Sequence, residues 1–388
     1  MSRIDDLIDQ HCPNGVEFIS LNEITFRSHN IKWAENPYSE FDYIDLTSVD
    51  RISHNIHPGV KINSVTAPSR AQQIVFEADI LFATTRPTQM RWTVIPKRFH
   101  GQIASTGFIV IRPDQSKVLP KFIAHYLGSE TFKFYVESNQ ILGNYPSIPD
   151  SRIRDFKIPL PPLVVQNEIV RILDTFTELE AELEAELEAR KKQYDHYRNE
   201  LLSTKVPSGI EFKTLGELLG PIPRGKRLTK SNLTADGSIP VFHGGLNPIG
   251  YHNESNTPGE TVMIINTGAS SGKVGWSSNP FWCSDGCFAL PHSKEISSRF
   301  LYHYASLKEQ FFTDKVRKAG IPTLASEPIL SLLIPVLPLP KQLEIVGILD
   351  SFAELTSNLS TGIPAEIEAR RKQYEYYRDS LLTFKELA

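Results

Sequence analysis

Two stretches of the chain carry apolar residues at the spacing of a coiled coil. In the first, apolar and aromatic residues recur mostly at steps of three and four, at Ile169, Ile172, Phe176, Leu179, Leu183, Leu187, Tyr194, Tyr197 and Leu201. This spacing places one seam along a helix that spans about 60 Å for 40 residues. Glutamates at alternate positions from Glu178 to Glu188 form its solvated face.

The second stretch repeats the first. Ten residues between Ile158 and Phe176 have identical partners 176 positions later, and ten between Glu188 and Leu202 have identical partners 180 positions later. The four inserted residues advance the helix by about 40°, and they include Gly362 and Pro364, which are poor helix formers. The sequence therefore predicts a break or kink at 362–364 that restores the register of two similar seams, which pack against each other.

Shorter matches extend the repeat into the rest of the chain, where Phe122, His125 and Tyr126 correspond to Phe300, His303 and Tyr304. Strand-type runs at 73–82 and 260–266 and helix-type stretches at 120–137 and 297–317 indicate α+β domains. We expect two similar globular domains, 1–157 and 206–333, separated by helices 158–205 and 334–388. The two His-Tyr pairs fit either a helix core or a platform for stacking bases.

Composition excludes several classes of protein. In 388 residues that are 40% hydrophobic, no apolar run approaches the roughly 20 residues of a membrane-spanning helix. Asp5, Asp6 and Asp9 occupy the place where a secretory signal has basic residues, so we expect a cytoplasmic protein without a membrane partner. Three cysteines without paired spacing predict reduced thiols rather than a disulfide framework or zinc site.

The net charge of −4 is unevenly distributed. Segments 158–205 and 334–388 carry −4 and −2, whereas 1–157 is neutral and 206–333 carries +2. The negative net charge of the chain therefore comes from the helical segments. The globular segments are neutral or slightly basic, which is compatible with binding nucleic acid through Lys and Arg.

Catalytic motifs occur only as fragments. Gly268 to Gly272 fits the spacing of a serine nucleophile elbow, but Val274 to Trp276 reads as a strand where the elbow needs a helix. The same residues are one position short of a phosphate-binding loop. Asn279 to Trp282 resembles the loop with which DNA amino-methyltransferases hold a target amine, without its second proline. We therefore expect no catalytic residues, no metal and no cofactor in this chain.

Cationic and amide-bearing residues cluster in both globular segments. Such side chains bind phosphates and read base edges, which makes them candidates for a DNA surface. The candidates in the first domain are Arg86, Thr88, Gln89, Arg91, Lys97 and Arg98. Those in the second domain are Arg224, Lys226, Arg227, Lys230, Ser270, Ser271 and Lys273. Segment 267–273 stands in the repeat roughly where segment 85–91 stands.

Two variable globular domains, each followed by a similar helix, resemble the specificity subunit of Type I restriction-modification systems. The resemblance rests on the proline-rich entries at 158–166 and 334–342, the Ile-Leu-Asp seams and the closing blocks Glu-Ala-Arg-(Lys/Arg)-Lys-Gln-Tyr-x-x-Tyr-Arg. It covers essentially the whole chain. The departure from the family pattern is the insertion at 362–364, which leaves the local form of the second helix open.

The resemblance implies a non-catalytic subunit. Each globular domain would read one half of a bipartite site in double-stranded DNA, and the helices would form an antiparallel intramolecular coiled coil that gives the molecule pseudo-two-fold symmetry. The coil would dock two adenine-N6 methyltransferase subunits, and motor-nuclease subunits would complete an ATP-dependent endonuclease. Candidate docking residues are Arg190, Gln193, Tyr194, Tyr197, Arg370, Gln373, Tyr374 and Tyr377. The tyrosines are equally compatible with simple packing.

Two other functions remain open from the sequence. A coiled-coil scaffold that binds protein through its globular ends would also suit the slightly negative net charge, but its binding would depend little on salt. A self-sufficient methyltransferase would depend on the incomplete loop at Asn279 and would have to bind its cofactor alone.

Overall fold

The computed structural model describes residues 3–57, 59–204, 209–229, 232–234, 236–357 and 361–387. The chain folds into two compact units. Unit 1 contains Met1–Glu182 and Ile367–Ala388, and unit 2 contains Leu183–Glu366. Each unit thus combines one globular domain with parts of both helical segments, so the compact units do not end where the repeated segments end. The expected boundary at 205–206 lies outside the described residues.

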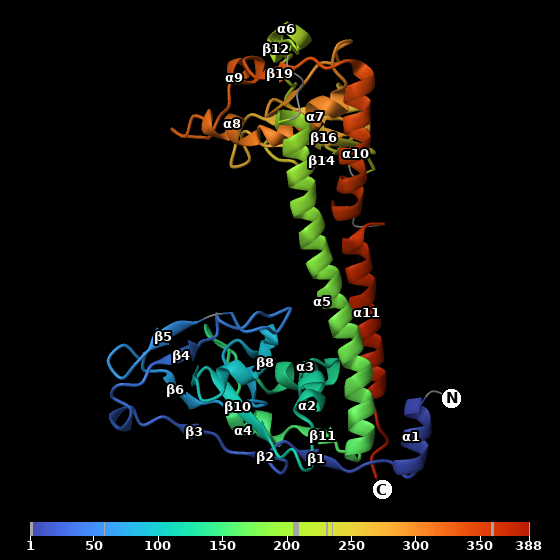
Figure 1. Ribbon diagram of the computed structural model, residues 1–388. Helices are drawn as coiled ribbons and strands as arrows, with labels where there is room; N and C mark the ends of the chain where they lie inside the picture. The colour runs from blue at the N-terminus through green and yellow to red at the C-terminus, as the bar shows by residue number, and fades with distance from the viewer. Residues whose placement is uncertain are drawn as a thin grey trace. The chain divides into compact units, whose positions relative to one another are not determined.

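The first helical segment forms one long helix, α5 (Leu163–Asn199), which continues as a π-helical turn, Glu200–Thr204. The second segment forms two helices, α10 (Leu339–Ser357) and α11 (Ile363–Leu381) (Figure 1). Gly362 precedes α11 and Pro364 lies in its first turn, where a missing amide hydrogen leaves no helical bond unmade. The second segment is therefore not one continuous helix.

Unit 1 contains three sheets in the described part of the chain. The two larger sheets have the strand orders β2-β10-β7-β8 and β3-β6-β9-β4-β5, and β1 pairs with β11. The strands of these sheets are β1 (Phe18–Ser20), β2 (Thr25–Phe26), β3 (His29–Asn30), β4 (Phe41–Ile44), β5 (Val60–Ile62), β6 (Ala71–Ile74), β7 (Ile80–Ala83), β8 (Trp92–Val94), β9 (Ile103–Ser105), β10 (Phe108–Pro113) and β11 (Lys157–Pro159). The helices and 3-10 turns are α1 (Arg3–His11), η1 (Trp33–Glu35), η2 (Pro87–Gln89), η3 (Lys97–Phe99), α2 (Pro120–Leu127), α3 (Glu130–Asn139) and α4 (Asp150–Asp155).

The strand-type run expected at 73–82 is interrupted. A turn separates β6 from β7, and the Asp79 carboxylate holds it by accepting the Phe76 N–H at 2.8 Å and binding Arg112 at 2.7 Å. Val75 and Ile80 are buried on both sides of the turn, which is why the apolar pattern looked continuous. The helix-type stretch at 120–137 likewise breaks, at Ser129, whose hydroxyl caps α3 by accepting the Phe132 N–H.

Unit 2 contains three smaller sheets in the described part of the chain. Its sheets have the orders β14-β13-β17 and β16-β15-β18, and β12 pairs with β19. The strands are β12 (Phe212–Thr214), β13 (Ile239–Phe242), β14 (Gly250–His252), β15 (Thr261–Ile265), β16 (Val274–Ser277), β17 (Trp282–Cys283), β18 (Cys287–Ala289) and β19 (Leu333–Pro335). The remaining helices are α6 (Leu215–Leu219), α7 (Ser298–Leu307), α8 (Glu309–Asp314) and α9 (Ser326–Leu330). All three cysteines of the chain are buried free thiols.

One buried glutamine joins the globular domain to the helix that follows it in each unit. The Gln166 carbonyl accepts the Leu119 N–H at 2.9 Å, and its amide donates to the carbonyls of Lys117 and Pro161. Gln342 does the same with the Ser297 N–H at 2.8 Å and the carbonyls of Glu295 and Leu337. Both side chains are fully buried. Without the glutamine, two backbone groups just before α2 or α7 and one buried carbonyl just before α5 or α10 would lose a hydrogen-bond partner.

A buried histidine then ties the domain to both helical segments. In unit 1, His125 on α2 lies between Asp174 of α5 (3.1 Å from Nε2) and Tyr374 of α11 (2.9 Å from Nδ1). In unit 2, His303 on α7 lies between Asp350 of α10 at 2.8 Å and Tyr194 of α5 at 3.4 Å. Because an ionised carboxylate only accepts, Nε2–H donates to the aspartate in both units, and Nδ1 lies in hydrogen-bond contact with the phenol. The paired histidines are therefore helix core rather than base-stacking platforms.

The helical segments run antiparallel in unit 1. Phe176 stacks on Tyr377 at 5.4 Å between ring centroids, and Glu180, further along α5, pairs with Arg371, which comes earlier in α11. In unit 2, the equivalent aromatic pair is Tyr197 on Phe352 at 5.3 Å. The start of each helical segment thus packs on its own globular domain, and its end packs on the domain of the other repeat.

Candidate nucleic-acid interface

In unit 1, the exposed candidates lie where the chain leaves β7. Arg86 adopts a left-handed conformation with φ of 52°, and the 3-10 turn Pro87–Gln89 follows it. Pro87 is buried, whereas the side chains of Arg86, Thr88 and Gln89 are exposed. The Arg86 guanidinium lies 5.7 Å from the centre of the Tyr145 ring. This turn therefore presents a cation, a hydroxyl and an amide together.

Arg91 plays a different part. Its guanidinium is half-buried and donates to the carbonyls of Leu46 and Val49, the latter at 2.9 Å. Burial, helped by the charge of Arg51, lowers the pKa of Arg91 from its usual value. Arg91 therefore holds the loop after β4 against the sheet. Its role in DNA binding stays a prediction.

Lys97 and Arg98 lie on the turn η3, and both side chains are exposed. Arg98 also donates from Nη2 to the carbonyl of Ile56 at 3.1 Å. The same region contains His54, whose ring stacks on Trp92 with centroids 3.8 Å apart. Burial lowers the pKa of His54 to about 4, although its hydrogen bond to the Trp92 carbonyl opposes this, so the ring is neutral at neutral pH.

In unit 2, Arg224, Lys226 and Arg227 form an exposed cationic segment. Its backbone is anchored, because the Lys226 N–H donates to the Cys283 carbonyl at 3.1 Å and the Trp282 indole donates to the Lys226 carbonyl at 2.7 Å. The cations therefore stand on a fixed backbone. Lys230 lies outside the described residues.

The residues expected to bind DNA in segment 267–273 are mostly engaged inside the unit. Ser271 is buried, and its hydroxyl has no hydrogen-bond partner in the described part of the chain. Ser270 is half-buried, and Lys273 Nζ pairs with Glu309 at 2.6 Å. The segment leads directly into strand β16, as the sequence predicts, so it lacks the strand-to-helix turn of a nucleophile elbow. Phe281 of the Asn279 loop is fully buried.

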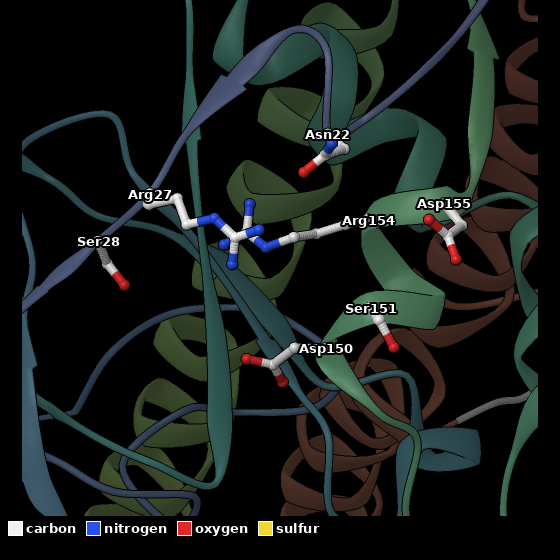
Figure 2. A pocket seen from close by; sticks show the side chains of 7 residues that line it. All are labelled: Asn22, Arg27, Ser28, Asp150, Ser151, Arg154 and Asp155. Carbon is white, nitrogen blue, oxygen red and sulfur yellow. The ribbon is translucent and has the colours of Figure 1, made fainter.

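A polar cavity of about 360 Å³ lies elsewhere in unit 1, between the chain after β2 and helix α4. Figure 2 shows the guanidiniums of Arg27 and Arg154 facing each other, with Asp150 below them and Asp155 turned aside. Burial and then the charge of Arg27 lower the pKa of Arg154, and burial raises that of Asp150. Two cations and two acids line this cavity, so its formal charge favours neither an anion nor a cation.

The candidate docking residues divide into two kinds. Tyr194, Tyr197, Tyr374 and Tyr377 make the internal contacts with histidine and phenylalanine described above. Arg190 bonds the side chains of Glu186 and Gln193 on the surface of α5, and Arg370 bonds Gln373 on α11 at 3.3 Å. The tyrosines thus have a packing role, and a partner surface would depend more on the arginines and glutamines. Among the described residues, no helix has the length and apolar character needed to cross a bilayer.

Sequence reasoning missed two features of this surface. It did not find the loop 141–147 that contacts Arg86, because that loop precedes a helix and carries no cation. It also assigned no role to Gln166 and Gln342, although their repetition among apolar residues within the matched blocks was the available signal.

Comparison with known proteins places both halves of the chain in one family. The family model for the Type I restriction modification DNA specificity domain matches residues 14–189 and again 207–369. The specificity subunit of the Type I restriction enzyme EcoR124I/EcoR124II from Escherichia coli is 31% identical over 309 residues, which are 70% of this chain and 72% of that protein.

Two solved structures have a similar fold. One, from a study of complex assembly and conformational transition of the type I R-M system, has a TM-score of 0.64 and 23% identity, over 95% of this chain and 98% of that one. The S subunit of a Type-I restriction-modification system from M. genitalium has a TM-score of 0.63 and 17% identity, over 95% and 96% of the two chains.

Proposed function

The chain belongs to the family of Type I restriction-modification DNA specificity subunits, and from this premise we propose that it reads a bipartite DNA sequence for a modification and restriction complex. Residues 1–157 read one part of the site and residues 206–333 read the other. The helical segments 158–205 and 334–388 set the spacing between them. Chemistry resides in partner subunits, so this chain supplies recognition and assembly.

One observation carries the proposal. The two units have the same frame, with matching glutamine and histidine contacts at the helices, but their exposed candidate residues lie at different places, on the turn 86–89 in unit 1 and on the segment 224–227 in unit 2. A duplex with two different sequences at its half-sites requires this combination: a repeated scaffold with two readers. A protein-binding scaffold would not need it, and family membership does not favour that alternative.

The partners follow from the same assignment. The domains bind double-stranded DNA. Two adenine-N6 methyltransferase subunits dock along the helices, and the polar side chains available there are Arg190, Gln193, Arg370 and Gln373. Motor-nuclease subunits complete the restriction complex. These events take place on DNA in the cytoplasm.

The experiment is methylation-site sequencing of DNA from cells that carry this chain and its modification subunit. It is repeated after replacing residues 206–333 with a different recognition domain, which keeps both helical segments. We expect adenine methylation at a two-part motif, and the replacement changes one part and leaves the other. If no motif depends on the chain, sequence recognition is wrong. If both parts change together, the assignment of one reader to each domain is wrong.

A further inference from the structure

Each unit contains a short loop closed by a pair of backbone hydrogen bonds. In unit 1, Ile141 and Ser147 exchange N–H···O bonds of 2.7 and 3.1 Å. In unit 2, Arg317 and Thr323 do the same at 2.9 and 3.1 Å. Each loop contains a proline at its sixth position, Pro146 or Pro322. The two loops are therefore the same element, although their sequences share little else.

Both loops are bound to a turn that follows a buried strand, β7 in unit 1 and β15 in unit 2. The Arg86 N–H donates to the Pro146 carbonyl at 2.7 Å, and the Gly268 N–H donates to the Pro322 carbonyl at 2.9 Å. A second hydrogen bond is also repeated. The Ile148 N–H donates to the Thr84 carbonyl in unit 1, and the Leu324 N–H donates to the Asn266 carbonyl in unit 2. Loop and turn thus form one surface in each unit, and its backbone is fixed.

The side chains on this common backbone differ and face solvent. Tyr145 is 74% exposed, and its counterpart Ile321 is 71% exposed. Leu142 is also exposed, and the exposed Lys318 takes its place in unit 2. The prolines and glycines suffice to form the turns, so neither fold requires an apolar tip. Exposed apolar groups on a fixed backbone are typical of binding surfaces.

We propose that loops 141–147 and 317–323 are DNA-reading elements, and that Tyr145 and Ile321 contact base edges in a groove of the two half-sites. This inference rests on the proposed function. Apolar side chains read thymine methyl groups, and an aromatic ring also packs on sugar and base surfaces. The Arg86 guanidinium above the Tyr145 ring can bind a phosphate while the ring contacts the base. Arg317 and Lys318 supply cations beside Ile321.

A common backbone with exchanged tips explains how one fold serves two half-sites. The hydrogen bonds to Pro146 and Pro322 place position 145 and position 321 equivalently in their units. The side chain at position 145 or 321 then determines which base the loop recognises. These positions are therefore specificity-determining, whereas the backbone groups of residues 141, 147, 317 and 323 close the loop.

The test uses the full chain with its modification subunits and a duplex of about 40 base pairs that carries the methylated motif. Two further duplexes have one part of the motif scrambled, and the domain replacement described above identifies the part that each unit reads. We expect Tyr145→Ala to raise the Kd for the intact duplex about tenfold, and to change it less than about twofold when the part read by unit 1 is scrambled. Ile321→Ala behaves in the same way for the other part. Tyr145→Phe keeps the ring and stays within about threefold of the unchanged chain.

Matched controls are Tyr38→Ala in unit 1, where the ring is 97% exposed, and Ile249→Ala in unit 2, which is also exposed. Both keep the Kd of the unchanged chain, and all variants keep its melting temperature. If Tyr145→Ala and Ile321→Ala behave like the controls on a chain that still methylates its motif, the loops do not read DNA. An equal loss of affinity on all three duplexes would mean that Tyr145 and Ile321 make only non-specific DNA contacts. A chain without any motif would overturn the proposed function, and this inference with it.

Discussion

The two junctions between domain and helices are chemically almost identical, whereas the two loops that we propose as DNA readers share little besides their backbone. His125 and His303, with their aspartate and tyrosine partners, repeat each other atom for atom. Tyr145 and Ile321 occupy equivalent positions with different chemistry. Residues that hold the architecture are buried and each have several partners, so few substitutions fit there. Residues at the exposed tips have few internal partners, so they can differ without loss of the fold.

The charged groups beside the two histidines make the junctions differ in one respect. Burial would raise the pKa of Asp174 and of Asp350, but hydrogen bonds from His125 and Lys121, or from Arg299 and His303, outweigh it and hold both pKa values below their usual range. Lys121 makes a single contact with Asp174 at 2.6 Å. Arg299 instead reaches Asp350 through two nitrogens and lies over the rings of Trp276 and Tyr302.

The largest effect is expected at the buried glutamines. Gln166→Ala and Gln342→Ala each remove three hydrogen bonds to backbone groups, one of them to a buried carbonyl, which should cost about 3 to 5 kcal/mol of unfolding free energy in the unit concerned. Amide hydrogen exchange in α2 and in α7 would measure the loss of unfolding free energy in each unit separately. The exposed Gln10→Ala is the control, with less than about 0.5 kcal/mol. A large loss at one glutamine and none at the other would show that the junctions are not equivalent.

Burial holds the pKa of His54 in unit 1 and of His303 in unit 2 below the usual value, so both units should lose stability in acid. The folded-state pKa of His54 is about 4, below the unfolded value near 6.5, so the unfolded chain binds more protons between these values. The stabilisation is therefore complete above about pH 6.5 and is lost as the pH falls toward 4, by about 3 kcal/mol in total. His54→Asn, which tolerates the positive φ at this position, should remove this slope from the unit 1 unfolding curve. An unchanged slope would place the responsible group elsewhere.

The DNA surfaces should differ from the junctions in their salt dependence. Arg86→Ala and Arg224→Ala should each weaken DNA binding severalfold and lower the slope of log K against log salt by about 1, because each removes one phosphate contact. Titrations at several salt concentrations measure both. Lys341→Ala, at an exposed lysine paired with Glu344 on α10, is the control. A weaker affinity with the same slope would mean that the arginine contacts a base rather than a phosphate.

The smallest expected effect is a difference in unfolding free energy between substitutions at the two histidine junctions. Lys121→Ala should cost at most about 1 kcal/mol, since the lysine is largely exposed. Arg299→Ala should cost up to about 2 kcal/mol, because the guanidinium also lies on two rings. Thermal unfolding of the two variants compares them. Equal costs would mean that the aromatic contacts of Arg299 add nothing.

Much of this architecture could be predicted because it is repeated. The seam through Ile169 and Ile172, the strand at Val274 and the two α+β domains follow from period and self-similarity in the sequence. The turn at Asp79 could not be predicted, since buried residues flank it on both sides. The sequence could not tell which candidate DNA residues are exposed. Arg86 and Arg91 have similar sequence surroundings, yet Arg86 is exposed and Arg91 is half-buried and donates to the Val49 carbonyl.

The sequence by itself determined that this protein has two similar domains, two similar helical segments and a break near Gly362, because helical period and repetition are local properties of the chain. Only the tertiary structure decided which residues meet. His125 lies against Tyr374, 249 positions away, and Pro146 against Arg86. Such contacts depend on how elements pack in three dimensions, and neither composition nor spacing records them. The loops we propose as readers were hidden from the sequence for the same reason.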